Sequence, residues 1–170
     1  MVFVPEIEII TFDYEGRKPQ KTQKANATNY DCEGFIAHGD SLFLFTKEWL
    51  TEQSTLYTLP KKSGNHLAKK RFTYEVNGLI TDATFHEKMD KVILTGYSST
   101  LQPFLYTIKN FSNINPSLHR TNRFKVGLPF HQIEGITFAT NNLIYCSNEQ
   151  FKRKFIANVP QMIHTMILND

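Results

Sequence analysis

Three acidic residues recur at corresponding places in this chain. Asp31 to Thr46 aligns without a gap on Gln132 to Ser147, which places Glu33 on Glu134, and Asp82 fits the same template halfway between them. Carboxylate oxygens are the ligands that calcium prefers in proteins. If the three repeats surround one channel, Glu33, Asp82 and Glu134 are expected to bind calcium. The alternative is that each carboxylate accepts hydrogen bonds from backbone or hydroxyl groups of a neighbouring repeat.

Four further residues are candidates for ligand binding. Glu48 and Glu149 both follow the second strand-like run of a unit, where they either face a loop-rich rim or stabilise a turn. His131 lies just before Glu134, and the alternative for it is a histidine satisfied by backbone groups. Trp49, the sole tryptophan, offers a stacking platform for sugar rings or a large side chain for the core. The sequence has neither a Gly-x-Ser-x-Gly elbow nor a phosphate-binding glycine loop, so no catalytic residue is assigned.

Short strand-like runs position these residues, and they repeat with a period of about 50 residues. Each run alternates or concentrates apolar residues between turn signals. A period of this length built from short strands is typical of the blades of a β-propeller. The expected strands are Cys32 to Ala37, Ser41 to Thr46, Ser54 to Leu59 and Ala68 to Val76, then Leu79 to Phe85, Lys91 to Gly96, Pro103 to Ile108 and Arg120 to Val126, then Ile133 to Phe138, Asn142 to Ser147 and Met162 to Leu168.

The sequence therefore predicts an all-β fold, a partial β-propeller of about three four-stranded antiparallel blades in a single domain, residues 1–170. Residues 1–30 are expected to end a preceding blade, with a strand over Ile7 to Tyr14. Residues 31–78 and 79–130 form two blades, and 131–170 an incomplete one. Three arrangements stay open: a fragment of a larger propeller, a subunit that completes a ring with a second copy through open strand edges, and a different all-β stack.

Composition narrows the possible partners. The formal charge is +3, and the basic residues are scattered apart from Lys61-Lys62, Lys69-Lys70-Arg71 and Lys152-Arg153-Lys154, so nucleic-acid binding is not expected. Those clusters are interpreted as solvated loops. No apolar stretch approaches the length of a membrane span, and the first residues lack the pattern of a secretion signal. Cys32 and Cys146 are expected to be buried free thiols.

Several motifs carry a family resemblance over nearly the whole chain. They are Asp31-Cys32-Glu33-Gly34, Ser41 to Trp49, Thr55 to Lys61, Asn77 to Ala83 and Phe130 to Ile136. These stretches resemble a poorly characterised group of β-propeller proteins from Bacteroidetes. The resemblance implies an exported protein of the periplasm or cell surface, because many members look exported or lipid-anchored and some carry a type IX secretion sorting domain. It implies no activity. This chain departs from the group in having no signal peptide, no sorting domain and too few blades.

Two classes of function follow. The first is a non-catalytic binding or interaction module that holds a protein, small-molecule or carbohydrate ligand on the loops of a rigid scaffold. The second is a divalent-cation-dependent hydrolase, phytase-like or esterase-like, which would use the three repeated acids. The lack of a nucleophile motif and of a histidine cluster favours the first class. Stabilisation by calcium would favour the second.

Overall fold

The computed structural model describes residues 6–17 and 24–168, and that part of the chain is all-β without any α-helix. Two short 3-10 turns, Glu87–Met89 and Pro116–Leu118, interrupt the strands. The strands are β1 (Ile10–Tyr14), β2 (Asp31–His38), β3 (Ser41–Lys47), β4 (Ser54–Pro60), β5 (Gly64–Tyr74), β6 (Leu79–His86), β7 (Lys91–Tyr97), β8 (Pro103–Lys109), β9 (Arg120–Lys125), β10 (Ile133–Phe138), β11 (Leu143–Asn148), β12 (Phe151–Arg153), β13 (Ala157–Val159) and β14 (Met162–Ile167).

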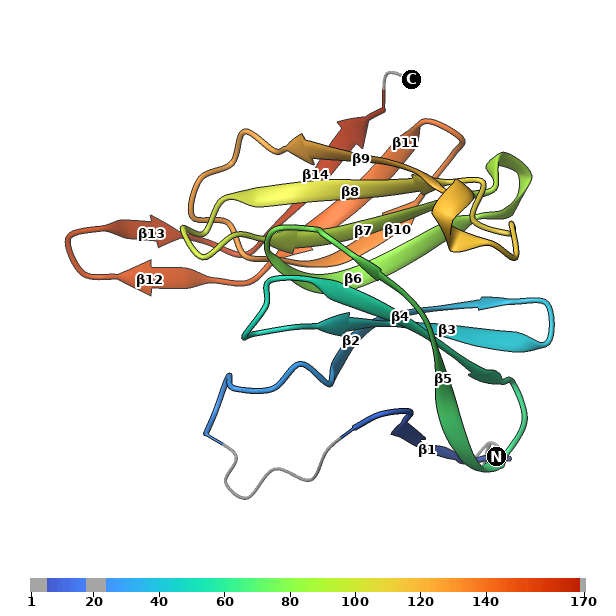
Figure 1. Cartoon of the computed structure of the whole chain (residues 1–170). Helices are drawn as coiled ribbons and strands as arrows, with labels where there is room; N and C mark the ends of the chain where they lie inside the picture. The colour runs from blue at the N-terminus through green and yellow to red at the C-terminus, as the bar shows by residue number, and fades with distance from the viewer. Residues whose placement is uncertain (1–5, 18–23, 169–170) are drawn as a thin grey trace, which may run out of the picture.

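The strands form four sheets, as Figure 1 shows. The five-stranded sheet has the order β1-β5-β4-β3-β2 and is curled, the four-stranded sheet is β6-β7-β8-β9, the three-stranded sheet is β10-β11-β14, and β12-β13 is a separate hairpin. Each expected strand of the three repeats is present, with β5 beginning several residues earlier than expected. The all-β prediction is therefore confirmed. The described residues do not close into a ring of sheets.

The first strands of the three repeats, β2, β6 and β10, pack in that order. The closest approach is at Gly34 of β2, where an added Cβ would lie 3.1 Å from both the Cβ and the backbone nitrogen of Ala83. A glycine at this place lets one sheet lie directly on the next, because any larger side chain would force the two strands apart. The repeats thus become successive layers.

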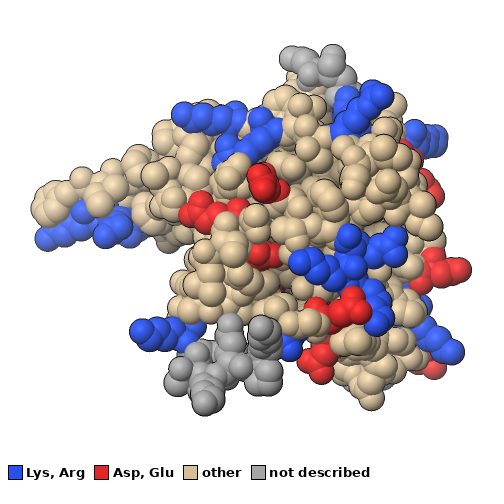
Figure 2. Space-filling model, in the orientation of Figure 1, with Lys and Arg blue, Asp and Glu red and all other residues tan. Residues whose placement is uncertain are grey.

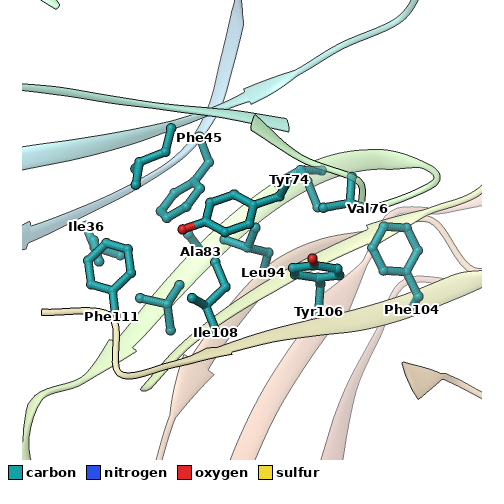
Figure 3. Packing of buried hydrophobic residues seen from close by; sticks show 13 residues of the cluster. Ile36, Phe45, Tyr74, Val76, Ala83, Leu94, Phe104, Tyr106, Ile108 and Phe111 are labelled. Atoms are coloured by element: carbon teal, nitrogen blue, oxygen red, sulfur yellow. The ribbon is translucent and has the colours of Figure 1, made fainter. Parts of the chain in front are cut away.

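Two cores lie between these layers. Strand alternation sends Val92 and Leu94 of β7 toward the five-stranded sheet and Ile93 toward the three-stranded sheet. The first core is aromatic, with Phe45, Tyr74, Phe104 and Phe111 among its members (Figure 3). The second is smaller and contains these buried residues: Ile93, Leu105, Ile133, Ile136, Ile144 and Cys146. The buried Cys146 thiol agrees with expectation, whereas Cys32 is exposed.

Strand β1 differs from its expected place at the end of a preceding blade. It joins the five-stranded sheet as a fifth strand, parallel to β5, with Ile10 opposite Gly64. Its Tyr14 ring packs 4.7 Å from the ring of Tyr57 and closes a third apolar cluster on the outer face of this sheet. The long β5 strand provides the open edge for this pairing, and parallel pairing of β1 cannot be seen in local sequence. A polar strand or loop expected up to Asn29 falls partly on residues 18–23, outside the described part.

Candidate functional site

Each first strand carries a β-bulge at the same distance from its hairpin turn. The bulged residues are Glu33 in β2, Thr81 in β6 and Glu134 in β10. Thr81, not Asp82, is therefore the structural equivalent of the two glutamates, and Asp82 corresponds to Gly34 and Gly135. The acids match in sequence with one residue inserted, but the ladder register is set by which residues face the cores. The expected equivalence of the three acids is corrected at Asp82.

Asp82 connects two sheets through its carboxylate. One oxygen accepts a hydrogen bond of 2.8 Å from the backbone N–H of Ile136 in β10, and the other accepts 2.7 Å from the N–H of Ala83. Burial raises the pKa of Asp82, although both backbone bonds act in the opposite direction. This geometry matches the alternative given above, a carboxylate that holds neighbouring repeats together, because both oxygens are already used.

Lys47, at the end of β3, lies at the centre of a polar cluster that was not predicted from the sequence. Its side chain is 6% exposed, and its Nζ lies 3.5 Å from a carboxylate oxygen of Glu33. The ammonium also lies 4.8 Å from the ring centre of Trp49 and 5.5 Å from that of Tyr97. Burial acts to lower the pKa of Lys47, but Tyr97, Glu33 and Glu134 more than offset this and raise it. The cluster therefore holds a buried, charged ammonium.

Glu134 belongs to the same cluster and is the most perturbed acid in it. Burial raises its pKa to about 7, Lys47 opposes this rise, and the nearby charges of Glu149 and Glu33 add to it. At neutral pH the side chain is therefore divided between a carboxylic acid and a carboxylate.

The repeated hairpins explain why these residues meet. Lys47 and Tyr97 occupy the same rung of successive hairpins, opposite Asp31 and Leu79. Glu149 is on the same rung of the third hairpin, where its N–H donates to the carbonyl of Gln132. One end of each hairpin thus contributes to one cluster. The signal was present in the sequence, but the third hairpin is one residue longer than the first, which shifts the 101-residue alignment by one position.

Glu48 and Glu149, which the alignment paired, occupy different environments. Glu48 is buried and accepts hydrogen bonds of 3.0 Å from the Thr46 hydroxyl and 2.6 Å from the Thr55 hydroxyl, and another from Thr51. It stabilises the turn between β3 and β4, one of the two alternatives considered. Glu149 is exposed and borders a pocket.

Trp49 covers Lys47 and does not offer a free stacking surface on that side. Its indole Nε1 donates a hydrogen bond of 3.2 Å to Asp31, and its backbone N–H donates to the carbonyl of Thr28. Because the Lys47 ammonium lies against one ring face, at most the other face is open to a sugar ring. Trp49 therefore acts first as a cover of the buried charge.

His131 forms part of a histidine pair in the third repeat. Its Nδ1 lies 3.0 Å from the carbonyl oxygen of Pro129, and its ring centre is 5.4 Å from that of His164. Burial, and then proximity to His131, lowers the pKa of His164, whose Nε2 lies 2.8 Å from the amide oxygen of Asn148. The contact of Nδ1 with a backbone carbonyl corresponds to the alternative considered for His131, but its buried Nε2 has no hydrogen-bond partner among the described residues.

A pocket of about 370 Å³ opens beside the polar cluster around Lys47. Its walls are Glu134, Ser147, Asn148, Glu149, Gln161, Met162 and Ile163. Two of these residues, Glu134 and Glu149, are acidic, and two, Met162 and Ile163, are apolar. Across residues 6–17 and 24–168, no three His, Cys, Asp or Glu side chains lie together so as to share a metal ion. The expected calcium ligands Glu33, Asp82 and Glu134 are therefore not brought together as a ligand set in the described part of the chain.

Comparisons of this chain with protein-family models, with curated proteins and with solved structures found no match. None of the helices in the part of the chain that the structure describes is long and apolar enough to cross a membrane.

Proposed function

We propose that this chain is a non-catalytic binding module, in which the three larger sheets act as consecutive blades of an incomplete β-propeller. The repeat of about 50 residues supports this proposal, as does the ordered packing of β2, β6 and β10 with a bulge on the same rung. Such a scaffold keeps one end of every hairpin in a fixed place. The ligand is held at the bulged end, in the pocket beside Glu134.

The charge of this pocket selects the class of ligand. Lys47 is already neutralised by Glu33, which leaves Glu134 and Glu149 as the acidic walls. An anionic ligand such as a phosphodiester is repelled there. A lysine or arginine side chain of a protein partner fits better, because its head group meets the two acids while its methylene stem lies along Met162 and Ile163.

The single observation that carries this proposal is the pocket itself, in which Glu134 and Glu149 lie beside Met162 and Ile163. Burial and the neighbouring acids also raise the pKa of Glu134 to about 7. An incoming cation favours the ionised form, so binding lowers this pKa and releases a proton near neutral pH. Proton release is a signature that non-specific attraction to an exposed acid does not give.

The test is calorimetric titration of the whole chain with a tetralysine peptide at pH 7, in two buffers of different ionisation enthalpy. We expect binding with release of a fraction of a proton, and loss of that release in Glu134→Gln. Glu149→Gln should weaken binding about three- to tenfold. Glu75→Gln, at an exposed acid outside the pocket, is the matched control and should bind as the unchanged chain does. Absence of binding, or binding that Glu134→Gln does not alter, would overturn the proposal.

A further inference from the structure

The hairpin β12-β13 projects from the body of the molecule (Figure 1). Phe151 pairs with Val159 at its base and Arg153 with Ala157 near its tip, where the N–H of Ile156 donates to the carbonyl of Arg153. The base is braced by Asn148, whose side-chain amide donates a hydrogen bond of 2.9 Å to the carbonyl of Pro160. The hairpin is thus a structured protrusion on a fixed support.

The tip of this hairpin is apolar and fully presented to solvent. Phe155 is 95% exposed and Ile156 53% exposed. Phe155 has a φ of 63°, in the left-handed region that a phenylalanine rarely adopts. Exposed apolar side chains at the end of a projecting element are costly in water, so their placement points to an apolar environment that receives them.

Three basic residues, here called the collar, follow one another along the β12 side of the hairpin up to its turn, where Lys154 directly precedes Phe155. Lys152, Arg153 and Lys154 are exposed, and the Nζ of Lys154 lies 5.1 Å from the ring centre of Phe155. The sequence has no aspartate or glutamate between Glu149 and Asp170, so nothing in this stretch neutralises the three cations. Figure 2 shows the protrusion with blue side chains along one edge and a tan end.

We propose that this hairpin docks on the surface of an anionic lipid bilayer. The hairpin matches the boundary between acyl chains and headgroups, because its turn carries two exposed apolar side chains with Lys154 beside them, and Lys152 and Arg153 follow on β12. Phe155 and Ile156 enter the boundary of the acyl chains while the collar stays among the anionic headgroups. A soluble polyanion would satisfy the collar but would leave the apolar tip in water.

The expected strength of membrane binding follows from these basic and apolar residues. Each basic residue near an anionic surface contributes about a fivefold gain in partitioning, so three give about a hundredfold. The two apolar side chains add a contribution that does not depend on salt. Binding is therefore expected to weaken with salt without disappearing.

The test is co-sedimentation of the whole chain with vesicles of phosphatidylcholine containing about 30% phosphatidylglycerol, compared with pure phosphatidylcholine. We expect binding to the anionic vesicles to be about a hundredfold stronger than to the neutral ones. Neutralisation of the collar by K152Q/R153Q/K154Q should reduce partitioning about a hundredfold. The matched control K69Q/K70Q/R71Q removes the same charge from β5, away from the hairpin, and should reduce it much less.

Two further variants separate membrane docking from simple charge attraction. F155S/I156S keeps all three cations and should reduce partitioning at least tenfold. Phe155→Trp should shift its emission to the blue on anionic vesicles, with Trp49 in the unchanged chain as the reference. Equal losses in the collar and β5 variants, no effect of F155S/I156S, or no sedimentation with anionic vesicles would overturn the proposal. Glu134→Gln should leave vesicle binding unchanged, so this proposal and that of the pocket fail separately.

Discussion

The carboxylate of Asp82 accepts the backbone N–H of Ile136, 54 residues away, across two sheets. Because β10 is the edge strand of its sheet, this N–H has no strand partner on that side. The Asp82 carboxylate therefore supplies an acceptor that the strand ladder does not. The bond also fixes the position of the three-stranded sheet relative to the four-stranded sheet.

Replacement of Asp82 by alanine should lower the free energy of unfolding by about 1–3 kcal/mol, because two backbone N–H groups lose their acceptor in a half-buried place. Asp82→Asn keeps one acceptor oxygen and should lose less. Urea denaturation measures both, and amide hydrogen exchange at Ile136 should accelerate in the alanine variant. Unchanged protection of Ile136 would show that this bond does not hold the sheets together.

Stability should depend on pH through Glu134. Its folded pKa of about 7 lies above the pKa of 4.5 that an ordinary glutamate has, so the folded chain binds the proton more tightly than the unfolded chain between these values. The contribution of this group to stability is therefore complete below about pH 4.5 and is lost as the pH rises through 7. Glu134→Gln should raise the melting temperature by about 2–4 °C at pH 8 and have little effect at pH 4.5. A larger effect at the lower pH would contradict this sign.

Glu48 should be the acid most important for stability. Glu48→Ala leaves three threonine hydroxyls without their shared acceptor and should cost about 2–4 kcal/mol in the free energy of unfolding. Glu48→Gln retains one acceptor and should cost less. Thermal unfolding followed by circular dichroism compares the two, with the exposed Glu75→Gln as the control. Equal stability of all three variants would argue against the role of Glu48 in the turn.

Gly34→Ala should disturb the contact between the first two sheets. The new methyl group would meet Ala83 at 3.1 Å, so the strands must separate by a few tenths of an ångström. We expect a loss of about 1–3 kcal/mol in chemical denaturation. Gly127→Ala provides the matched control, because its Cβ would meet nothing within 4 Å. A similar loss in both variants would show that the contact with Ala83 is not its cause, because the entropy of the unfolded chain alone favours alanine over glycine.

Calcium should not stabilise the chain. Both oxygens of Asp82 already accept backbone hydrogen bonds, and Glu33 pairs with Lys47. Addition of about 5 mM calcium, or of a chelator, should leave the melting temperature unchanged, since only a ligand that binds the folded state raises it. A calcium-dependent rise that Glu33→Gln abolishes would restore the metal site expected from the sequence.

The strands of the three repeats could be predicted because each has a local signal, whereas the short strands β12 and β13 were not predicted. Leu56 to Leu59 and Leu105 to Ile108 repeat almost the same letters, and both lie in the third strand of a repeat, β4 and β8. Turn residues bound most of these strands, so alternation and turn chemistry alone located them.

The site could be predicted only in part, because its geometry depends on register. Glu33 and Glu134 both raise the pKa of Lys47, but a bulge at Thr81 puts Asp82 out of register with them. Lys47 and Tyr97 join the cluster only because their hairpins place them on one rung. A shift of one residue in register moves a side chain to the other face of the sheet. The sequence does not show which strand of a hairpin contains the extra residue of the bulge.

The parallel pairing of β1 with β5 affects the order in which the molecule assembles. The other described strand pairs are antiparallel, and most join neighbours in the chain, whereas β1 must close a loop to residues 64–68. Three of its five residues are exposed, and Tyr14 alone is buried. We therefore expect this strand to attach late in folding and to open first, as a local unit that uncovers Tyr57 while the two inter-sheet cores stay intact.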